Sequence, residues 1–441
     1  MSAPGTRGVA AAAARMGLAL ALGASAARAA GEAASARAMR IPLAIAAKGG
    51  GAPACEIAGG TAAPLSGVAF SPDGKRLAAG GYGEVLVWDL AGARLERRLG
   101  AGRIGSMVQA VLFDKPGNRV IAAAGEPYAE GRVLVFDLAT GEVAAEFKEP
   151  RGVATCLALS PDGKWLAAGS GDAQAYVWNL EEKTLAATLK QHALSVLCVS
   201  FSGDGKYLVT GGADKVVQVW EVGPWTPDRR ETHFEESVRA CYLRSSRASG
   251  ATVQHQFAAV VGGKESRSIQ VRLDDKAQPW ARKDTRLDLP SGLPLDGVWL
   301  SRKGAHRVYV GCSDGTVKAY DENKQLSFDP VAVLAGHGDW VYGVALSADG
   351  SRLASASGDG TVKVWDLNDH ALLATLAQVA PGADAWAIVS GKGYFAASSP
   401  AVVTWRWPGA APAADKLAAL ADPDMVKKSL AGQAPPDPAL W

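Results

Sequence analysis

The chain has 441 residues, of which 48% are hydrophobic and 20% charged, and its formal net charge at pH 7 is +2. A charge so close to neutral gives no reason to expect a nucleic acid or an anionic membrane surface as the partner. The low charge and the 51 glycines are typical of a turn-rich, all-β globular protein.

The N-terminus has the pattern of a secretory signal peptide. Two arginines precede an apolar run from Met16 to about Ala24, and residues 27–29 offer a small-x-small cleavage site. The run is too short to span a bilayer. We therefore expect residues 1–29 to be removed, residues 30–51 to be a disordered leader, and the mature chain to be periplasmic or secreted with no membrane span. The alternative is an Ala-rich leader or a misassigned start codon, which would leave the protein cytoplasmic.

One phrase recurs between residues 52 and 407. It is a short apolar run, Ser-Pro-Asp-Gly or a variant, a Leu-Ala-Ala-Gly run, and an alternating segment that ends in an aromatic residue and Asp. The clearest copies begin at Val68, Leu157 and Val344. Pro presets φ and Gly supplies a positive φ, so each Ser-Pro-Asp-Gly predicts a hairpin turn. A period of roughly 40 to 50 residues with three or four strands per unit predicts a single β-propeller.

The expected number of blades is eight. Six units end in an aromatic signature, at Trp88, Phe136, Trp178, Trp220, Tyr320 and Trp365. A degenerate unit fills the gap before Tyr320, and an eighth unit at 385–407 stops after its third strand. Because an open sheet edge promotes aggregation, we expect residues 54–59 to add the missing outer strand and close the ring. A seven-bladed ring is the alternative, if the 385–407 unit lies outside the ring or the degenerate unit forms no blade.

These units resemble the WD-repeat propeller family over about residues 54 to 407. In that family a His, a Ser or Thr, an Asp and the third-strand Trp form a structural hydrogen-bond chain in each blade. Two units match in full, and the resemblance implies an architectural role for the quartets His192, Thr210, Asp214 and Trp220, and His337, Ser355, Asp359 and Trp365. The segments 82–90 and 393–407 look most like exported WD-repeat proteins of planctomycetes and myxobacteria, a looser resemblance than that to the family.

No catalytic, cofactor-binding or metal-binding residues are predicted. The six histidines form no His-x-His or His-x-x-x-His pair, and the five cysteines form no Cys-x-x-Cys pair. No Gly-x-Ser-x-Gly elbow and no phosphate-binding loop is present. We therefore expect a non-enzymatic scaffold that binds one or more proteins. The rival is a ligand-binding or hydrolytic propeller that uses the central channel.

Candidate partner-binding residues lie on loops. In the family, the connections between the outer strand of one blade and the inner strand of the next form the commonly used face. Here they supply Met107, Gln109, Asp296, Asp339, Trp340 and Tyr342. Two irregular insertions add Trp225 and Trp280, which either bind a partner or pin their loops to the blades. The last segment, 408–441, is expected to be a linker, a short helix that Asp422 can cap, and a loosely held tail.

Overall fold

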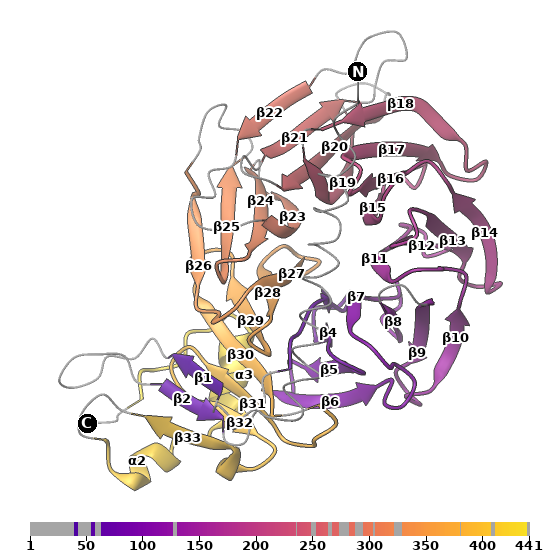
Figure 1. The fold of residues 1–441 in the computed structure, drawn as a ribbon. Coiled ribbons are helices and arrows are strands. Elements are labelled where there is room, and N and C mark those ends of the chain that lie inside the picture. The colour runs from indigo at the N-terminus through magenta and orange to yellow at the C-terminus, as the bar shows by residue number, and fades with distance from the viewer. Residues whose placement is uncertain are drawn as a thin grey trace, which may run out of the picture.

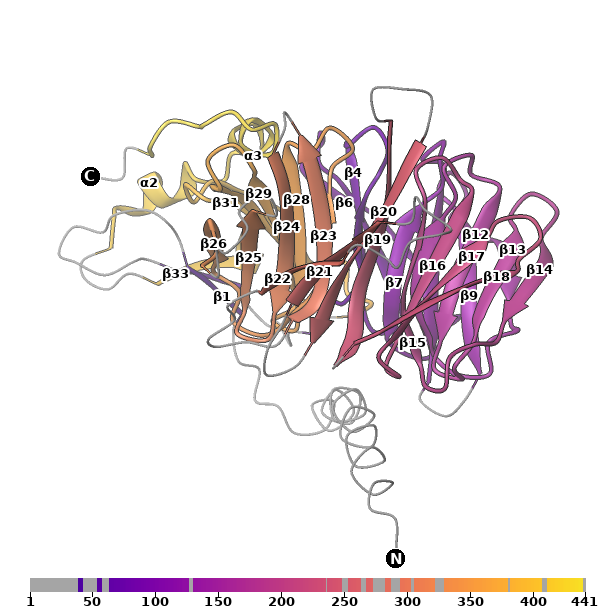
Figure 2. The same cartoon turned by 90° about the horizontal axis from the view of Figure 1, so that it is seen from above.

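The computed structural model describes residues 39–42, 54–57, 63–126, 130–234, 236–247, 253–262, 267–272, 282–286, 294–302, 305–321, 329–379, 381–406 and 411–438. Within these residues the chain forms small antiparallel sheets that follow one another around a ring (Figure 1). Seen from above, the strands run along the thickness of the ring, and α2 (Ala414–Ala418) and α3 (Pro423–Leu430) lie at its rim (Figure 2).

Six of the sheets have four strands each, and we call them blades 1 to 6. Their strands are, in blade 1, β3 (Val68–Phe70), β4 (Arg76–Gly80), β5 (Val85–Asp89) and β6 (Arg94–Leu99); in blade 2, β7 (Val108–Phe113), β8 (Arg119–Gly125), β9 (Gly131–Asp137) and β10 (Val143–Phe147); in blade 3, β11 (Ala154–Leu159), β12 (Trp165–Ser170), β13 (Ala175–Asn179) and β14 (Thr184–Leu189); in blade 4, β15 (Val196–Phe201), β16 (Tyr207–Gly212), β17 (Val216–Glu221) and β18 (Pro227–His233); in blade 5, β19 (Ser237–Arg247), β20 (Val253–Gly262), β21 (Arg267–Arg272) and β22 (Arg282–Arg286); in blade 6, β23 (Pro294–Arg302), β24 (Ala305–Cys312), β25 (Thr316–Asp321) and β26 (Ala332–Ala335).

The strands follow from the local sequence. In the turn before β4, the Ser71 hydroxyl donates to Asp73 at 2.6 Å, and Gly74 has a φ of 67°, which a residue with a Cβ adopts only with strain. Such a turn fixes the register of the hairpin that it joins. Both faces of each blade are then buried against neighbours, so the middle strands are mostly apolar up to the polar residue that ends the third strand.

A six-stranded sheet occupies the place between blade 6 and blade 1. Its strands are β27 (Val341–Leu346), β28 (Arg352–Ser357), β29 (Thr361–Asp366), β30 (Leu372–Gln378), β31 (Trp386–Ser390) and β32 (Phe395–Ala397). The innermost strands contact one another in order around the ring, and β27 also contacts β3. The ring is therefore completed by packing between separate sheets, and no sheet closes on itself.

The expectation of eight blades is wrong. The degenerate unit does form a four-stranded sheet, blade 5, but the 385–407 unit does not form a blade of its own. Its first two strands, β31 and β32, extend the outer edge of β30 instead. The seven-bladed alternative is also wrong, because only six sheets have four strands and the sheet between blades 6 and 1 has six.

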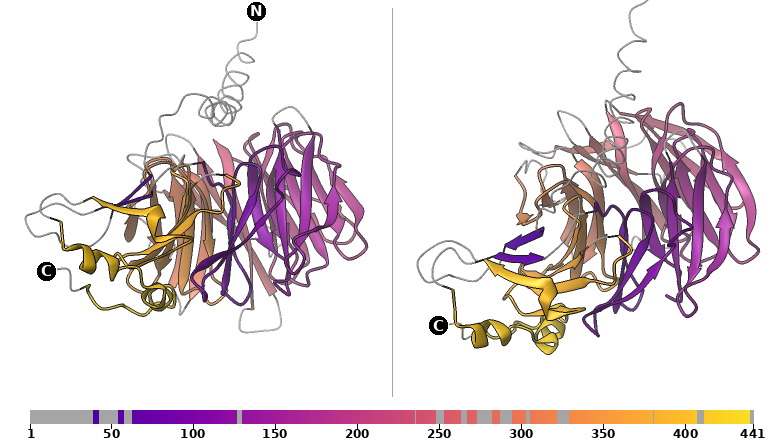
Figure 3. Two further views of the ribbon diagram at one scale, coloured as in Figure 1. Left: turned by 90° about the horizontal axis from the view of Figure 1, so that it is seen from below. Right: turned by 60° about the horizontal axis from the view of Figure 1, so that its bottom comes forward.

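The expected closure of the ring by an N-terminal strand is also wrong, because the 385–407 unit forms no blade for that strand to complete. β2 (Ala54–Ile57) does pair with β33 (Val403–Arg406), from Ala54 opposite Arg406 to Ile57 opposite Val403. Together with β1 (Met39–Pro42) these strands form a separate three-stranded sheet outside the ring (Figure 3). The turn of 3-10 helix at Pro400–Val402 separates β33 from β32, and Pro400 has no N–H to continue a ladder.

The largest hydrophobic cluster joins this three-stranded sheet to the ring. Ile41 and Ile57 from the N-terminal strands and Val426 from α3 are buried in it, together with Trp88 of blade 1. The Trp88 and Trp386 rings meet edge to face at 6.1 Å. The Asp422 side chain accepts from the N–H groups at the start of α3, which fixes the helix that covers β30 to β32. The two terminal regions of the chain thus share one core.

Candidate interaction face

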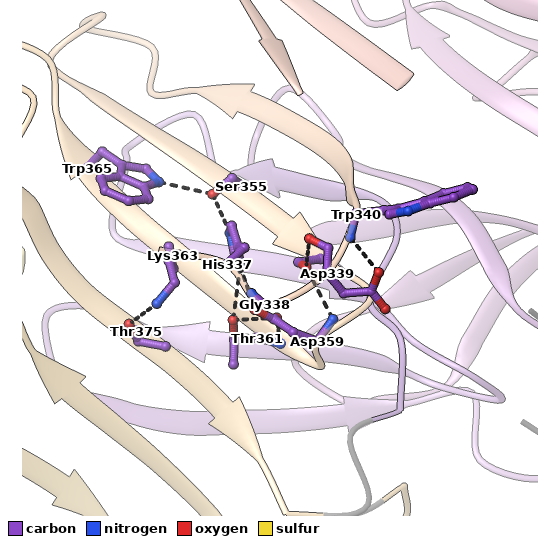
Figure 4. Close-up of polar contacts among 11 residues, drawn as sticks. His337, Gly338, Asp339, Trp340, Ser355, Asp359, Thr361, Lys363, Trp365 and Thr375 are labelled. Carbon is purple, nitrogen blue, oxygen red and sulfur yellow. Dashed lines mark hydrogen bonds and ion pairs between the residues drawn. The ribbon is translucent and has the colours of Figure 1, made fainter. Parts of the chain in front are cut away.

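A chain of hydrogen bonds runs through the six-stranded sheet (Figure 4). The Trp365 Nε1–H donates to Ser355 Oγ at 3.0 Å, and the Ser355 hydroxyl lies 2.8 Å from His337 Nε2. His337 Nδ1 lies 3.0 Å from an oxygen of Asp359, whose carboxylate also accepts from Gly338 N at 2.8 Å. The four residues therefore link the middle strands β28 and β29 to the two loops that precede β27 and β29.

The electrostatics of this quartet favour a neutral histidine beside an ionised aspartate. Burial lowers the pKa of His337 and outweighs the opposing effect of the Asp359 hydrogen bond. Burial would raise the pKa of Asp359, but the hydrogen bonds from His337 and Gly338 hold it well below its usual range. His337 then donates from Nδ1 and accepts at Nε2 from Ser355.

An Asp-His-Ser arrangement invites comparison with a hydrolytic triad. The Ser355 side chain is fully buried and its oxygen already accepts from Trp365, so it presents no nucleophile to a substrate. The neighbouring Lys363 is also buried, with Nζ 2.9 Å from Thr375 Oγ1, and burial lowers the pKa of this amine to about 8. These polar groups are satisfied within the sheet, which is the arrangement that rigidifies a fold.

Blade 4 repeats the same quartet. His192 bridges Asp214 at 3.0 Å and Thr210 at 2.8 Å, and the Trp220 Nε1–H donates to Thr210 at 3.1 Å. Blade 1 has no such chain: Trp88 Nε1 has no hydrogen-bond partner among the described residues, and the indole packs against Trp386 instead. The polar chain thus recurs in some sheets of the ring and is replaced by aromatic packing in another.

Asp359 of the quartet and the two residues before it also fix the loop that carries Trp340. Gly338 is held by Asp359, the Asp339 carbonyl accepts from Ser357 Oγ at 3.0 Å, and the Trp340 carbonyl accepts from Gly358 N at 2.9 Å. The backbone before β27 is therefore tied to the loop between β28 and β29 at three consecutive residues. Such a loop loses little conformational entropy when a partner binds.

The Trp340 side chain points away from the quartet toward solvent (Figure 4) and is 40% exposed. Its ring lies 6.0 Å from that of Tyr342, tilted by 53°, and Tyr342 is half-buried. Asp339 is exposed beside them, and its carboxylate accepts from Trp340 N at 2.8 Å. The structure thus brings three of the sequence-predicted residues together at one end of the ring.

A third aromatic residue lies at the same end, on blade 1. Tyr82 is 40% exposed and forms an antiparallel bridge with Met107, in the connection between blades 1 and 2. Gly83 N donates to Ser106 O at 2.9 Å, which ties the two loops together. We call Tyr82, Met107, Asp339, Trp340 and Tyr342 the aromatic face. Blade 1 adjoins the six-stranded sheet, so these residues occupy neighbouring sectors of the ring.

Sequence reasoning missed Tyr82. The signal was available in the repeat: in an antiparallel blade the loop between the second and third strands lies at the same end as the connection from one blade to the next. Tyr82 is in the former type of loop and Trp340 is in the latter. Gln109, which was predicted from the connection itself, is half-buried in β7.

The other predicted partner-binding residues are placed elsewhere. The Asp296 carboxylate accepts from Gly297 N at 2.8 Å and from Val344 N at 2.9 Å, so it bridges blade 6 and β27. Burial raises the pKa of Asp296 to about 6. Trp225 packs edge to face on Trp165 at 5.3 Å, at the opposite end of its blade, which pins its loop to blade 3. Trp280 lies outside the described residues.

The ring of short antiparallel sheets, most of them with an aromatic residue near the end of the third strand, defines a propeller-type repeat protein. Comparison with protein families agrees with this. The model described as "WD domain, G-beta repeat" matches residues 53–89, 141–179, 183–221 and 328–366, so the chain contains WD40 repeats. The last two of these segments each contain one complete quartet, and the match at 328–366 also includes Trp340.

Curated relatives match over short stretches. Striatin-4 of Homo sapiens is 42% identical over 67 residues, which are 13% of this chain and 9% of the relative. The DDB1- and CUL4-associated factor 11 homolog of Caenorhabditis elegans is 39% identical over 75 residues, 17% of this chain and 13% of the relative. The ribosome biogenesis protein WDR12 homolog of Chlamydomonas reinhardtii is 38% identical over 72 residues, 16% of each chain.

The chain thus spans less than a fifth of the length of these relatives. All three are eukaryotic proteins, so they do not support the finer resemblance to exported bacterial WD-repeat proteins. In the part of the chain that the structure describes, no group of three or more His, Cys, Asp or Glu residues is placed to hold a metal ion. Among the helices described, none has the length and apolar character needed to cross a membrane.

Proposed function

We propose that this chain is a non-enzymatic scaffold that binds other proteins through the aromatic face. The observation that carries the proposal is the exposed Trp340 on a backbone fixed by three consecutive hydrogen-bonded residues. Trp and Tyr are enriched among the residues that dominate the energy of protein interfaces. A rigid ring presents them at small entropic cost. Most of the free energy gained when a partner buries them therefore contributes to affinity.

The repeats support a binding function over a catalytic one. Propellers of this class are built from blades that hold their loops in place. The residues that resemble a triad, His337, Ser355 and Asp359, form hydrogen bonds inside the sheet instead of facing a substrate. The relatives carry names such as "DDB1- and CUL4-associated factor", which describe association with other proteins. That property is a proposal for this chain, because the matched stretches are short.

The partner is proposed to be a protein. With a net charge of +2 the chain lacks the excess of basic residues that nucleic-acid binding requires. The rival function, ligand binding or hydrolysis in the central channel, would need convergent polar groups there. The buried carboxylate of Asp296, on the innermost strand of blade 6, is engaged by two backbone N–H groups and bridges blade 6 to β27.

We further propose that the mature protein is periplasmic or secreted in a bacterium. The support is the sequence pattern of residues 1–29, followed by the leader at 30–51. Intact-mass analysis of the protein purified from its native host tests this proposal. The mass of a chain cleaved after residue 29 supports export. The mass of an uncleaved chain, found in the cytoplasmic fraction, contradicts it.

The scaffold proposal is tested by affinity purification from the native organism, followed by titration of the purified partner against variants. Trp340→Ala and Tyr82→Ala are expected to weaken binding while Leu185→Ala does not. Leu185 is the matched control, because it is 42% exposed but lies on β14, the outer strand of blade 3. Equal affinities for all three variants would remove the aromatic face as the binding surface.

A further inference from the structure

Two cysteines face each other across the interface between blades 4 and 5. Cys198 is in β15 and Cys241 is in β19, the innermost strands of the two blades, and these strands are in contact. Both residues are buried in one hydrophobic cluster with Val238 and Phe234. Val199, next to Cys198, packs with blade 3, and Ala240, next to Cys241, packs with blade 6. Because successive residues of a strand point to opposite faces, the two thiols lie on the faces that blades 4 and 5 turn toward each other.

The local packing directs the Cys198 side chain toward blade 5. It lies over Gly211, where an added Cβ would come within 2.6 Å of the Cys198 sulfur and of Val238. The Cys198 thiol is 3.8 Å from Gly211 O and 3.9 Å from Val238 O. The absence of a side chain at Gly211 leaves the space that the Cys198 sulfur occupies, next to Val238 of blade 5.

The neighbouring interface shows the same geometry without the second thiol. Cys156 lies opposite Gly169 in blade 3 as Cys198 lies opposite Gly211 in blade 4. It packs in the cluster that contains Val199, the blade 4 residue at the position that Cys241 has in blade 5. Blades 3 and 4 therefore meet through a thiol and a valine, whereas blades 4 and 5 meet through two thiols.

We propose that Cys198 and Cys241 form a disulfide bond that joins blades 4 and 5 when the chain folds in the presence of a disulfide oxidant. The thiolate of one cysteine attacks a low-molecular-weight disulfide such as oxidised glutathione and releases one glutathione thiol. The second cysteine then displaces the remaining glutathione from the mixed disulfide. The two cysteines lose two protons and two electrons in total, and the oxidant is reduced to two thiols.

The bond forms during assembly of the ring rather than after it. In the folded chain burial raises the pKa of Cys198 well above its ordinary value, so the thiolate that would attack the oxidant is scarce. Before blades 4 and 5 pack, both thiols are exposed to solvent. The bond closes a loop of about 40 residues, a length at which cross-linking restricts the unfolded chain appreciably. It thereby secures the degenerate blade 5 to a regular neighbour.

Refolding of the reduced, purified full chain in a glutathione redox buffer tests the proposal. The expected product has a mass about 2 Da lower than the reduced chain, and its non-reducing peptide map contains a Cys198–Cys241 linked peptide. The oxidised form is expected to melt a few degrees higher than the reduced form. Folded, reduced protein in the same buffer is expected to oxidise much more slowly.

Two variants sharpen the test. Cys241→Val reproduces the thiol–valine contact of the neighbouring interface, and we expect it to fold but to lose both the linked peptide and the difference in Tm. Val199→Cys creates the same pairing between blades 3 and 4, and we expect it to gain a second cross-link, to Cys156. Recovery of all five cysteines as free thiols after oxidative refolding of the wild type would overturn the proposal. A linked peptide between any other pair would also overturn it.

Discussion

The packing of the terminal strands against the ring predicts a large cost for Ile57→Ala. Ile57 is fully buried in the cluster shared by β2, α3 and blade 1. The substitution removes three carbon atoms, worth about 2.4 kcal/mol of transfer free energy at roughly 0.8 kcal/mol each. A residual cavity adds to this, so we expect a loss of about 3 kcal/mol in the free energy of unfolding.

Urea unfolding followed by tryptophan fluorescence measures this loss, because Trp88 and Trp386 lie in the same cluster. The matched control is Val333→Ala, another truncation of a β-branched residue, at a position that is 50% exposed on β26. We expect the control to change stability by less than about 0.5 kcal/mol. If Ile57→Ala were as stable as this control, the three-stranded sheet would not be packed on the ring, and the reasoning would fail.

Three further predictions concern the quartet, the aromatic face and the buried carboxylate. Asp214→Ala is expected to destabilise the fold by roughly 1–3 kcal/mol by leaving His192 unsatisfied, and binding should fall only in proportion to the unfolded fraction; loss of binding by a fully folded variant would contradict a structural role. Trp340→Ala should leave the Tm nearly unchanged and weaken partner binding by roughly 2 kcal/mol or more in a titration, whereas an unchanged Kd would move the interface elsewhere. Because burial raises the pKa of Asp296 to about 6 in the folded chain, the folded state binds more protons than the unfolded one between about pH 4 and 6, so stability should fall as the pH rises through this range and then level off. Asp296→Asn should flatten that part of the pH profile, and an unaltered profile would assign the effect to another group.

The amino-acid sequence determined the local structure of the repeats. The alternating apolar pattern and the Ser-Pro-Asp-Gly turns place hairpins such as β3–β4 and β11–β12, because φ preferences and side-chain alternation act over only a few residues. The spacing of His337, Ser355, Asp359 and Trp365 could be recognised for the same reason: the four positions keep fixed offsets within one repeat.

The sequence also predicted that residues 54–59 pair with the 402–407 strand, which residues 54–57 and 403–406 do, but it did not predict where that pair lies. A strand pattern specifies that backbone groups must find partners; it does not specify which sheet provides them. The same 385–407 segment satisfies its hydrogen bonds either as a new blade or as an extension of β30. The choice between the two is made by how the blades pack around the ring. That packing involves contacts between residues far apart in the chain.

The tertiary structure alone decided which residues share a surface or an interface. Tyr82 and Trp340 lie in neighbouring sectors of the ring only because β27 packs beside β3, and these residues are far apart in the chain. Cys198 meets Cys241, whereas Cys156 meets Val199, because each innermost strand faces the strand one blade further on. Local preferences cannot encode such neighbours, since they are set by the packing of whole sheets around a common axis.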